Sequence, residues 1–350
     1  MKIAILGLPK SGKSTIFNCL TNQIDQKTNS FGIMKVPDNR VEELSKLSSS
    51  IKTSFAELEI MDSESSQIFN DSSEFFSDEI VNSLQEFDAI ILIIRSFNDP
   101  SVPHPFGLVE PEKDLEHFLL EQRFRDINMI EKRIEKIDSE KNTLNKKNQE
   151  LSKTQTDLLR SLKNEFENGI SFEEINNNNE FKKIFQESFF LSSIPTTIVF
   201  NIDENHIDEN LENYTKDIFQ AKIYGKLEEE LLLLDKKEAE EIRQDLKIND
   251  YSIQNLVNQI LKQNHIIHFL TTGEKDTKAW QIKSGSTAVE SAQKIHSDIS
   301  RGFIRAEVIH YSELLKSGSF SEAKKKGILR TEGKDYIVKN GDVINFLFSV

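Results

Sequence analysis

Residues 7–14 read Gly-Leu-Pro-Lys-Ser-Gly-Lys-Ser, a complete phosphate-binding loop motif. The apolar run Ile3–Leu6 precedes the motif and predicts a buried parallel strand. The segment Thr15–Leu20 follows the motif and predicts the first turns of a helix. A strand, a glycine loop and a helix N-terminus together form an anion site, because backbone N–H groups turn inward and the helix dipole adds positive charge. The sequence therefore predicts that this chain binds a nucleoside triphosphate, or descends from one that did.

The residues of this loop have distinct expected roles. The glycines permit its tight path, Lys13 can reach the β- and γ-phosphates, and the Ser14 hydroxyl can be a ligand of Mg²⁺. Lys13 is therefore assigned to the catalytic machinery as well as to nucleotide binding. We expect nucleotide contacts along the whole stretch, which comprises Leu8, Pro9, Lys10, Ser11, Gly12, Lys13, Ser14 and Thr15.

Composition limits the class of protein. The 350 residues suggest two or three domains, and the net charge of −14 argues against a generic binder of polyanions. The charge is uneven, since residues 266–350 carry 13 Lys and Arg against 10 Asp and Glu. The single cysteine, Cys19, excludes an internal disulfide and fits a reducing cytosol. No apolar stretch approaches the roughly 20 residues that span a bilayer. We expect a cytoplasmic protein without a membrane partner.

The order of apolar runs predicts an α/β fold with a mainly parallel sheet. Runs at 56–61, 89–94 and 196–200 alternate with helical segments, as expected for a nucleotide-binding domain. Apolar residues from 122 to 190 follow helical spacing and predict an inserted antiparallel pair of charged helices. The last 85 residues predict a small α+β module, with short strands at 266–270, 280–282, 336–338 and 343–348 and a helix at 288–297.

Several blocks in the C-terminal part are similar to the YchF-type, Obg-like ATPases, a branch of the translation-factor-related P-loop GTPases. These blocks are Thr272–Lys275, Ala279–Trp280, Ile295–Asp298, Arg301–Val308 and Gly333–Val338. The resemblance covers nearly the whole chain and implies three parts. They are a nucleotide-binding domain at 1–121 and 191–265, a helical coiled-coil domain at 122–190, and a C-terminal TGS domain of ubiquitin-like (β-grasp) fold at 266–350.

The resemblance also implies the activity. Members of this family hydrolyse ATP slowly and work on ribosomes, in regulating translation or a stress response. The TGS and helical domains are expected to contact the ribosome, either the large subunit or the whole particle, and RNA, with Arg301 and Arg305 as candidate contacts. We expect a monomer.

The choice of base is expected to depend on residues 201–204. Guanine-specific relatives carry Asn-Lys-x-Asp after this strand, whereas this chain has Asn201-Ile202-Asp203-Glu204. The longer Glu204 carboxylate does not keep the two-bond geometry to guanine, so ATP is predicted over GTP, with GTP still possible. Asn201 can bond the base or the loop. By resemblance, Ala221 and Lys222 form the last loop on the base side.

His104 is a candidate catalytic residue by resemblance, because the family has a histidine at this place on a mobile loop and lacks the glutamine of Ras-like relatives. An imidazole there can orient the attacking water. Without the resemblance, a histidine in a proline-rich loop is more simply an exposed residue.

Two segments depart from the family pattern. Asp62, the expected outer ligand of Mg²⁺, is present, but Ser63-Glu64-Ser65 replaces the glycine that senses the γ-phosphate. The first switch is shortened to a few residues ahead of Val36–Arg40, and Thr28 is a poor replacement for its threonine. Two functions therefore stay open: a Mg²⁺-dependent ATPase, or a ribosome- or RNA-binding protein whose hydrolysis has decayed and for which the nucleotide is a structural ligand.

Overall fold

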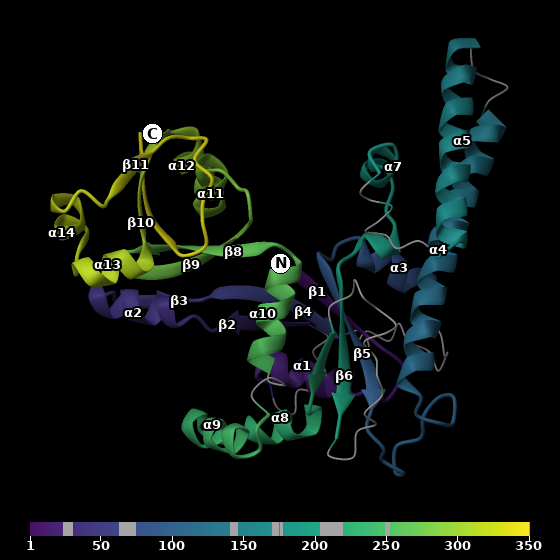
Figure 1. The fold of residues 1–350 in the computed structure, drawn as a ribbon, viewed down its shortest axis with the longest axis horizontal. Helices are drawn as coiled ribbons and strands as arrows, with labels where there is room; N and C mark the ends of the chain where they lie inside the picture. Colours follow the sequence, from purple (N-terminus) through teal and green to yellow (C-terminus); the bar gives the residue numbers. More distant parts are fainter. Residues whose placement is uncertain are drawn as a thin grey trace. The chain divides into compact units, whose positions relative to one another are not determined.

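The computed structural model describes residues 1–23, 31–62, 75–140, 146–169, 175, 178–203, 220–248 and 253–349. These residues form two compact units (Figure 1). Unit 1 comprises residues 1–32 and 59–252, and unit 2 comprises residues 33–58 and 253–350. The predicted division into three domains stays a prediction, and α4 (Pro111–Glu140) runs across its expected boundary at residue 122. No helix in the part of the chain that the structure describes has the length and apolarity needed to span a membrane.

One six-stranded sheet has the order β2-β4-β1-β5-β6-β7. Neighbouring strands from β4 to β7 are parallel. The strands are β1 (Lys2–Leu6), β2 (Phe31–Val36), β4 (Ala56–Asp62), β5 (Ala89–Ser96), β6 (Thr196–Ile202) and β7 (Gln220–Ile223). The prediction of a mainly parallel sheet is confirmed, because the apolar runs that lack polar alternation are the fully buried central strands.

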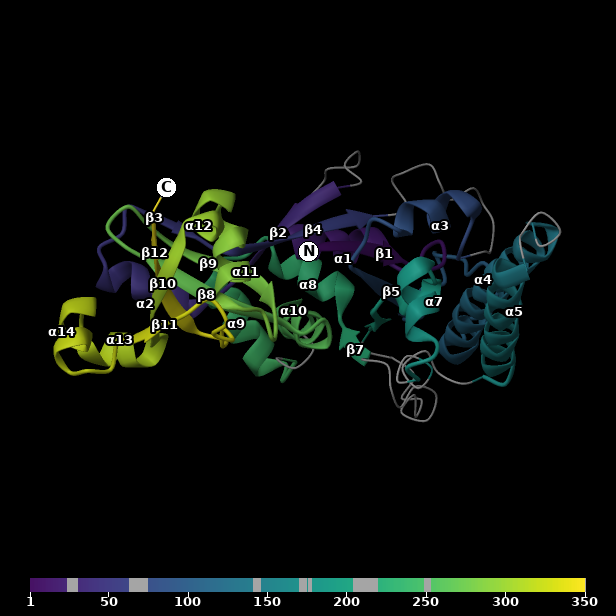
Figure 2. The same ribbon diagram turned by 90° about the horizontal axis from the view of Figure 1, so that it is seen from above.

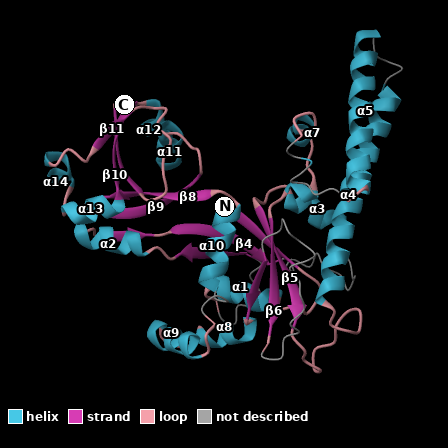
Figure 3. Cartoon of the chain, viewed as in Figure 1, coloured by secondary structure: helices cyan, strands magenta, loops and turns pink. Residues whose placement is uncertain are grey.

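Helices of unit 1 cover the sheet (Figure 3). One core joins β1, β5 and β6 to α3 (Asp78–Leu84) and to the first turns of α4, through residues such as Leu92, Phe118 and Phe200. The helix α1 (Lys13–Thr21) contacts β1 and α8 (Gly225–Leu231). The remaining helices of the unit are α7 (Lys182–Glu187), α9 (Lys236–Asp245) and the short 3₁₀ helix η3 (Leu191–Ser193).

The predicted helical pair consists of α4 and α5 (Lys146–Glu167), which lie side by side in Figures 1 and 2. Lys163 of α5 pairs with Glu131 of α4 at 2.6 Å, and Arg160 lies 3.8 Å from Asp138, so the two helices are antiparallel. A second core, which includes Ile130, Leu162 and Phe166, lies within this arm. The helix α4 therefore contributes side chains both to the core of the sheet and to the core of the arm.

Unit 2 has a sheet in the order β11-β10-β12-β8-β9-β3. Its strands are β3 (Lys52–Ser54), β8 (Ile266–Thr272), β9 (Asp276–Lys283), β10 (Phe303–His310), β11 (Arg330–Glu332) and β12 (Asp342–Phe348). The antiparallel β8–β9 hairpin, the helix α11 (Ala288–Ile295) and the parallel pairing of β12 with β8 form the predicted β-grasp arrangement, to which β3 adds an edge strand. The other helices are α2 (Asn39–Leu47), α10 (Ile253–Gln263), α12 (Ser297–Arg301), α13 (Tyr311–Ser317) and α14 (Phe320–Lys325).

The strand expected at residues 336–338 does not form. Residues 336–338 form only an isolated bridge, between Ile337 and Thr287. Their backbone bonds go to the start of α11: Ala288 N–H donates to Tyr336 O at 2.8 Å, and Val338 N–H donates to Ser286 O at 3.0 Å. The backbone of this run bonds to a helix start, which the period and composition of the sequence alone do not distinguish from pairing within a sheet.

Candidate nucleotide-binding site

The loop between β1 and α1 follows the path that its glycines permit. Gly7 has φ +154° and Gly12 has φ +95°. A Cβ at Gly7 would overlap with the carbonyl oxygen of Ile93, and a Cβ at Gly12 would overlap with Nδ2 of Asn201. Side chains are therefore excluded at both positions by close neighbours as well as by backbone strain at Gly12.

Lys13 lies inside this loop. Its side chain is buried, with 1% of the residue exposed, and Nζ donates to Gly7 O and Leu8 O at 2.7 Å each. The ammonium group is thus held at the centre of the loop by carbonyl oxygens. Because a buried ammonium group needs compensating acceptors, this position is suited to an anionic ligand that adds further acceptors.

No side chain caps the N-terminus of α1. Gly12 precedes the helix and carries no side chain that could accept from its first N–H groups. The hydroxyl of Ser11 is buried and has no hydrogen-bond partner among the described residues. An unpartnered buried hydroxyl beside a helix N-terminus that no side chain caps fits the binding of a phosphate group. The other predicted contact residues surround it: Leu8 is buried, Pro9 and Thr15 are half-buried, and Lys10 is exposed.

Ser14 and Asp62 form the candidate metal position. Ser14 Oγ donates to Asp62 Oδ2 at 2.9 Å, which joins the first turn of α1 to the end of β4. Asp62 is 3% exposed, whereas Ser14 is exposed. A hydroxyl and one carboxylate are oxygen donors of the kind that Mg²⁺ takes from protein beside substrate phosphates. Among the described residues, no group of three or more His, Cys, Asp and Glu is placed to hold a metal ion.

Asn201, at the end of β6, holds the loop. Its Nδ2 donates to Ser11 O at 3.0 Å, and its Oδ1 accepts from Gly225 N–H at 3.1 Å. Both polar atoms of this buried amide are thus bonded to backbone groups. Of the two expected contacts of Asn201, with the loop or with the base, the structure contains the contact with the loop. The neighbouring Ile202 packs its side chain in the core of the sheet. Glu204 lies outside the described residues.

The expected position of the last loop needs a correction. Ala221 and Lys222 are not in a loop: they lie in β7, paired with Val199 and Phe200 of β6. The chain leaves the sheet after them, and Gly225, which opens α8, is the residue that contacts Asn201. A Cβ at Gly225 would lie 2.5 Å from Asn201 Oδ1. The sequence signal for this position is a glycine directly after a short strand and before a helix, which the resemblance at Ala221 obscured.

His104 is buried rather than exposed. Its Nδ1 accepts from Phe106 N–H at 3.3 Å, so Nε2 carries the proton and donates to Asp114 Oδ2 at 3.0 Å. Burial raises the pKa of Asp114 above its ordinary value even though His104 opposes that shift. Both ring nitrogens are therefore engaged within the protein, and the catalytic role of His104 stays a prediction.

Arg95 organises the segment that leads to His104, and sequence reasoning did not select it. Its guanidinium group donates to Phe97 O at 3.2 Å, to Val102 O at 2.9 Å and to Asp99 O at 3.2 Å. Only 2% of this residue is exposed. An arginine at the end of the apolar run 89–94 is the available signal, because a charged residue in a buried strand must find partners.

Replacing His104 with alanine distinguishes its structural role, the hydrogen bond to Asp114, from its predicted catalytic role, the orientation of water. The variant leaves the buried Asp114 carboxyl without its donor and is expected to lower the free energy of unfolding by about 2–4 kcal/mol. Asp114→Ala breaks the same pair but retains the imidazole, and it serves as the matched control. If His104 orients water, His104→Ala lowers kcat by at least about tenfold while Asp114→Ala does not. Equal kcat values in the two variants would assign His104 to the fold alone. Urea unfolding and steady-state ATP hydrolysis give the two quantities.

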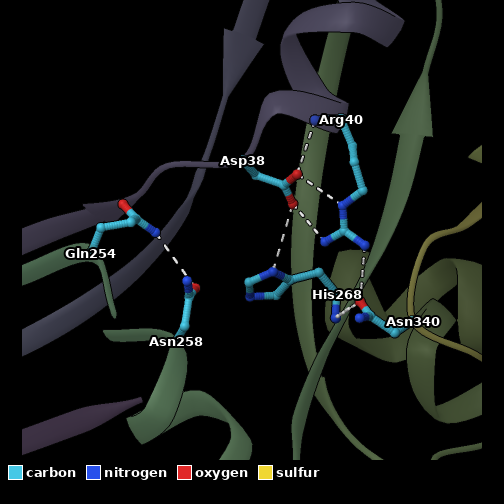
Figure 4. Close-up of polar contacts among 6 residues, drawn as sticks. All are labelled: Asp38, Arg40, Gln254, Asn258, His268 and Asn340. Atoms are coloured by element: carbon cyan, nitrogen blue, oxygen red, sulfur yellow. Dashed lines mark hydrogen bonds and ion pairs between the residues drawn. The ribbon is translucent and has the colours of Figure 1, made fainter. Parts of the chain in front are cut away.

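The segment Val36–Arg40, which follows the shortened first switch, contributes Asp38 and Arg40 to a polar cluster of unit 2 (Figure 4). Asp38 is the N-cap of α2 and accepts from Arg40 N–H at 3.0 Å, from Arg40 Nε at 2.8 Å and from Arg40 NH2 at 2.7 Å. Its Oδ2 also lies 3.8 Å from His268 Nδ1. Asn340 Oδ1 accepts from Arg40 NH1 at 3.1 Å and from His268 N–H at 3.2 Å. The cluster thus ties α2 to β8 and to the turn before β12.

This cluster has a predicted pH signature. Burial raises the pKa of Asp38, but His268 and Arg40 outweigh burial and hold the pKa well below its usual range. A carboxyl with a lowered folded-state pKa contributes stability above its unfolded pKa of about 3.9, and this contribution is lost as the pH falls further. We expect Asp38→Asn to lower the free energy of unfolding by about 2 kcal/mol at pH 7, with the difference shrinking below about pH 4.

The single tryptophan, Trp280 in β9, reports unfolding of unit 2 by fluorescence in urea. Asp335→Asn, at an exposed position of the same unit, is the control and is expected to change little at any pH. A wild-type advantage over Asp38→Asn that stays constant from pH 7 to pH 3 would contradict the argument.

A glycine loop between the first strand of a parallel sheet and its helix, with a buried lysine and a serine–aspartate pair, defines the class of P-loop NTPases. The comparisons with known proteins narrow this class. Residues 266–349 match the family model YchF-GTPase_C, described as a protein of unknown function (DUF933).

Three relatives are similar over nearly their full length. A Bacillus subtilis (strain 168) protein named ribosome-binding ATPase YchF is 31% identical, with 99% of this chain and 98% of that protein covered. A protein of the same name from Buchnera aphidicola subsp. Acyrthosiphon pisum is also 31% identical, with 100% and 99% covered. The structure of the Schizosaccharomyces pombe YchF GTPase has the same fold, with a TM-score of 0.86 at 21% identity and 99% and 97% of the two chains covered. The chain belongs to the YchF family, as its sequence motifs predicted.

Proposed function

We propose that this protein is a Mg²⁺-dependent ATPase of low rate that associates with ribosomes and prefers ATP to GTP. The observation that carries the proposal is the phosphate-binding loop, which combines the buried Lys13 side chain, the unpartnered Ser11 hydroxyl and a helix N-terminus that no side chain caps. The relatives named ribosome-binding ATPases are similar in sequence to this chain over nearly its whole length, which supports the same activity here.

The metal position is proposed at Ser14 and Asp62. Their oxygen atoms lie 2.9 Å apart, one exposed and one buried, which fits a hydroxyl ligand with a carboxylate behind it. When bound, Mg²⁺ would neutralise charge on the phosphate oxygens. In this chain Lys13 would hold the phosphates, Ser14 would orient toward the metal, and Asp62 would keep the Ser14 hydroxyl in place.

Base selection is proposed to favour adenine. Asn201 holds the loop to Gly225, so it sets the position of the base-side segment without needing to read the base. The residue that would reject adenine in guanine-specific relatives is an aspartate, and this chain has Glu204 in its place. GTP is then expected to bind more weakly than ATP, because the longer Glu204 side chain is not expected to keep the two-bond geometry to guanine.

The ribosome is proposed as the partner, with the helical arm and the C-terminal module as the contacting parts. Arg301, with 78% of its side chain exposed, and Arg305, also exposed, are candidate contacts to RNA. Arg301 lies 3.5 Å from Asp298, so part of its charge is used locally. The large subunit or the whole particle is proposed as the site of contact. A monomer in the cytoplasm is the proposed state.

The test uses Lys13→Ala beside the wild type. We expect ATP hydrolysis by the wild type and none by the variant. Co-sedimentation with ribosomes is expected to depend on a non-hydrolysable ATP analogue in the wild type and to lose that dependence in the variant. Equal hydrolysis by both preparations would expose a contaminating ATPase and contradict the proposal.

A second function is a ribosome-binding protein with decayed hydrolysis. It is favoured by one observation of the structure, the engagement of both nitrogens of His104 with Asp114 and Phe106, and by the replacement of the switch glycine in the sequence. This alternative predicts ribosome association that survives Lys13→Ala. Loss of nearly all ribosome binding in that variant would count against it.

A further inference from the structure

The base of the helical arm holds the chain just before α3. Glu121 of α4 accepts from two consecutive backbone N–H groups, Phe75 N–H at Oε2 and Phe76 N–H at Oε1, each at 2.9 Å. Arg125, one turn further along α4, donates to Phe76 O and lies 2.5 Å from Asp78 Oδ1. Three backbone groups of this dipeptide are thus bonded by side chains of one helix.

The aromatic side chains of the same dipeptide are fixed by α4 as well. Phe75 and Phe76 are both fully buried, with ring centroids 5.2 and 5.1 Å from that of Phe118. Because backbone and side chains of Phe75 and Phe76 both bind to α4, this helix and the dipeptide are expected to move as one body. We call Glu121, Arg125, Phe75 and Phe76 the arm-base clamp.

The next polar residues of α4 hold a second segment. Asp126 accepts from Leu191 N–H at 2.7 Å and from Ser192 N–H at 3.0 Å, and Gln122 Nε2 donates to Leu191 O at 3.3 Å. Burial raises the pKa of Asp126 to about 6, although the two N–H groups oppose that shift. This segment leads into β6, whose end carries Asn201.

Both held segments are connected to the nucleotide site. The rings of Phe75 and Phe76 belong to the buried core that also contains Leu6, at the end of β1, and Leu8 of the phosphate-binding loop. The chain that follows Leu191 enters β6 and ends at Asn201, which bonds the phosphate-binding loop. In the other direction, α4 continues into the core of the arm at Ile130 and pairs with α5 through Glu131.

We propose that the arm-base clamp couples the nucleotide site to the helical arm, and that Glu121 and Arg125 are positioning residues for this coupling. The inference rests on the proposed nucleotide binding and adds to it a path by which occupation of the site and displacement of the arm affect each other. Since coupling between two sites is reciprocal, a partner bound to the arm changes nucleotide affinity by the same factor. The partner class that uses this path is the one proposed for the arm, the ribosome.

The test compares amide hydrogen exchange with and without a non-hydrolysable ATP analogue and Mg²⁺. Peptides covering residues 7–20 report nucleotide binding, and peptides covering residues 127–140 of α4 report the arm. In the wild type we expect the analogue to slow exchange in both regions. In Glu121→Gln, which retains one acceptor oxygen where two are needed, we expect protection of residues 7–20 to persist and the protection of residues 127–140 to fall by about half or more.

Two further variants complete the design. Arg125→Met removes the other half of the clamp and is expected to give the same loss of arm protection. Glu116→Gln removes an exposed carboxylate from the same helix, outside the clamp and outside both reporter regions, and it is expected to behave as the wild type. Circular dichroism establishes that each variant is folded.

The outcomes separate the two proposals. Wild-type protection of residues 7–20 without protection of residues 127–140 would overturn the coupling alone. Full arm protection in both Glu121→Gln and Arg125→Met would also overturn it and would leave nucleotide binding intact. Absence of protection at residues 7–20 in the wild type would contradict the proposed nucleotide binding, and the coupling with it.

Discussion

Lys13→Ala is expected to lower the affinity for a Mg²⁺-bound ATP analogue by about 100-fold or more. In the wild type, Lys13 as a residue is 1% exposed, and Gly7 O and Leu8 O accept from its ammonium group at 2.7 Å. Charge-assisted hydrogen bonds to phosphate contribute about 1.5–3 kcal/mol each, and each 1.4 kcal/mol corresponds to a tenfold change in affinity. Two such bonds therefore account for the expected loss, which calorimetric titration measures.

Two controls distinguish lost charge from lost structure. Lys13→Met keeps the buried aliphatic stem and removes only the ammonium group, so it is expected to lose nearly as much affinity as Lys13→Ala. Lys10→Ala removes an exposed charge from the same loop and is expected to reduce affinity only a few-fold, since exposed charges are screened by solvent and salt. Wild-type affinity in Lys13→Met would contradict the assigned role.

Gly12→Ala is expected to give the second largest effect. Its φ of +95° disfavours any side chain, and the added Cβ would overlap with Asn201 Nδ2. Asn201 cannot withdraw freely, because the same amide accepts from Gly225 N–H and donates to Ser11 O. The loop or the amide must then shift, and we expect at least about a tenfold loss of affinity for the ATP analogue, since misplaced donors no longer converge on the phosphates.

A matched variant at Gly107 tests whether a positive φ alone accounts for the effect of Gly12→Ala. Gly107 also has a positive φ, +87°, but a Cβ there would meet nothing within 4 Å. Gly107→Ala is expected to cost about 1 kcal/mol of folding free energy and to leave nucleotide affinity unchanged. In the double variant Gly12→Ala/Asn201→Ala the overlap is gone, so the losses are expected to be less than additive. Strict additivity would indicate that the two residues do not act through each other.

Much of the fold was predictable because its central strands are continuous apolar runs. Residues 3–6 and 89–94 carry no alternation and became buried parallel strands. The strand β10 was missed, since charged Arg305 and Glu307 interrupt its apolar residues, and its burial depends on pairing with β11 and β12. Residues 336–338 have a strand-like composition, but their partners are the residues that start α11.

The site was predictable only where a motif fixes local geometry. Lys13 and Ser14 follow from the loop itself, because the spacing of glycines determines the backbone path around them. The partner of His104 could not be predicted from the sequence. Aspartate is usually exposed, and the burial of Asp114 depends on how α4 packs on the sheet. The use of Asp38 in a cluster with Arg40 and His268 likewise requires residues that lie far apart in the chain.

The most direct test of the account is calorimetric titration of the nucleotide-free wild-type protein with non-hydrolysable analogues of ATP and GTP in the presence of Mg²⁺. If the loop at residues 7–14 is a working nucleotide site, the ATP analogue is expected to bind with a Kd on the order of micromolar, a binding free energy of about −8 kcal/mol, and the GTP analogue is expected to bind clearly more weakly. Binding of neither analogue would contradict the central claim that the loop at residues 7–14 is a working nucleotide site, and tighter binding of the GTP analogue would contradict the proposed selectivity.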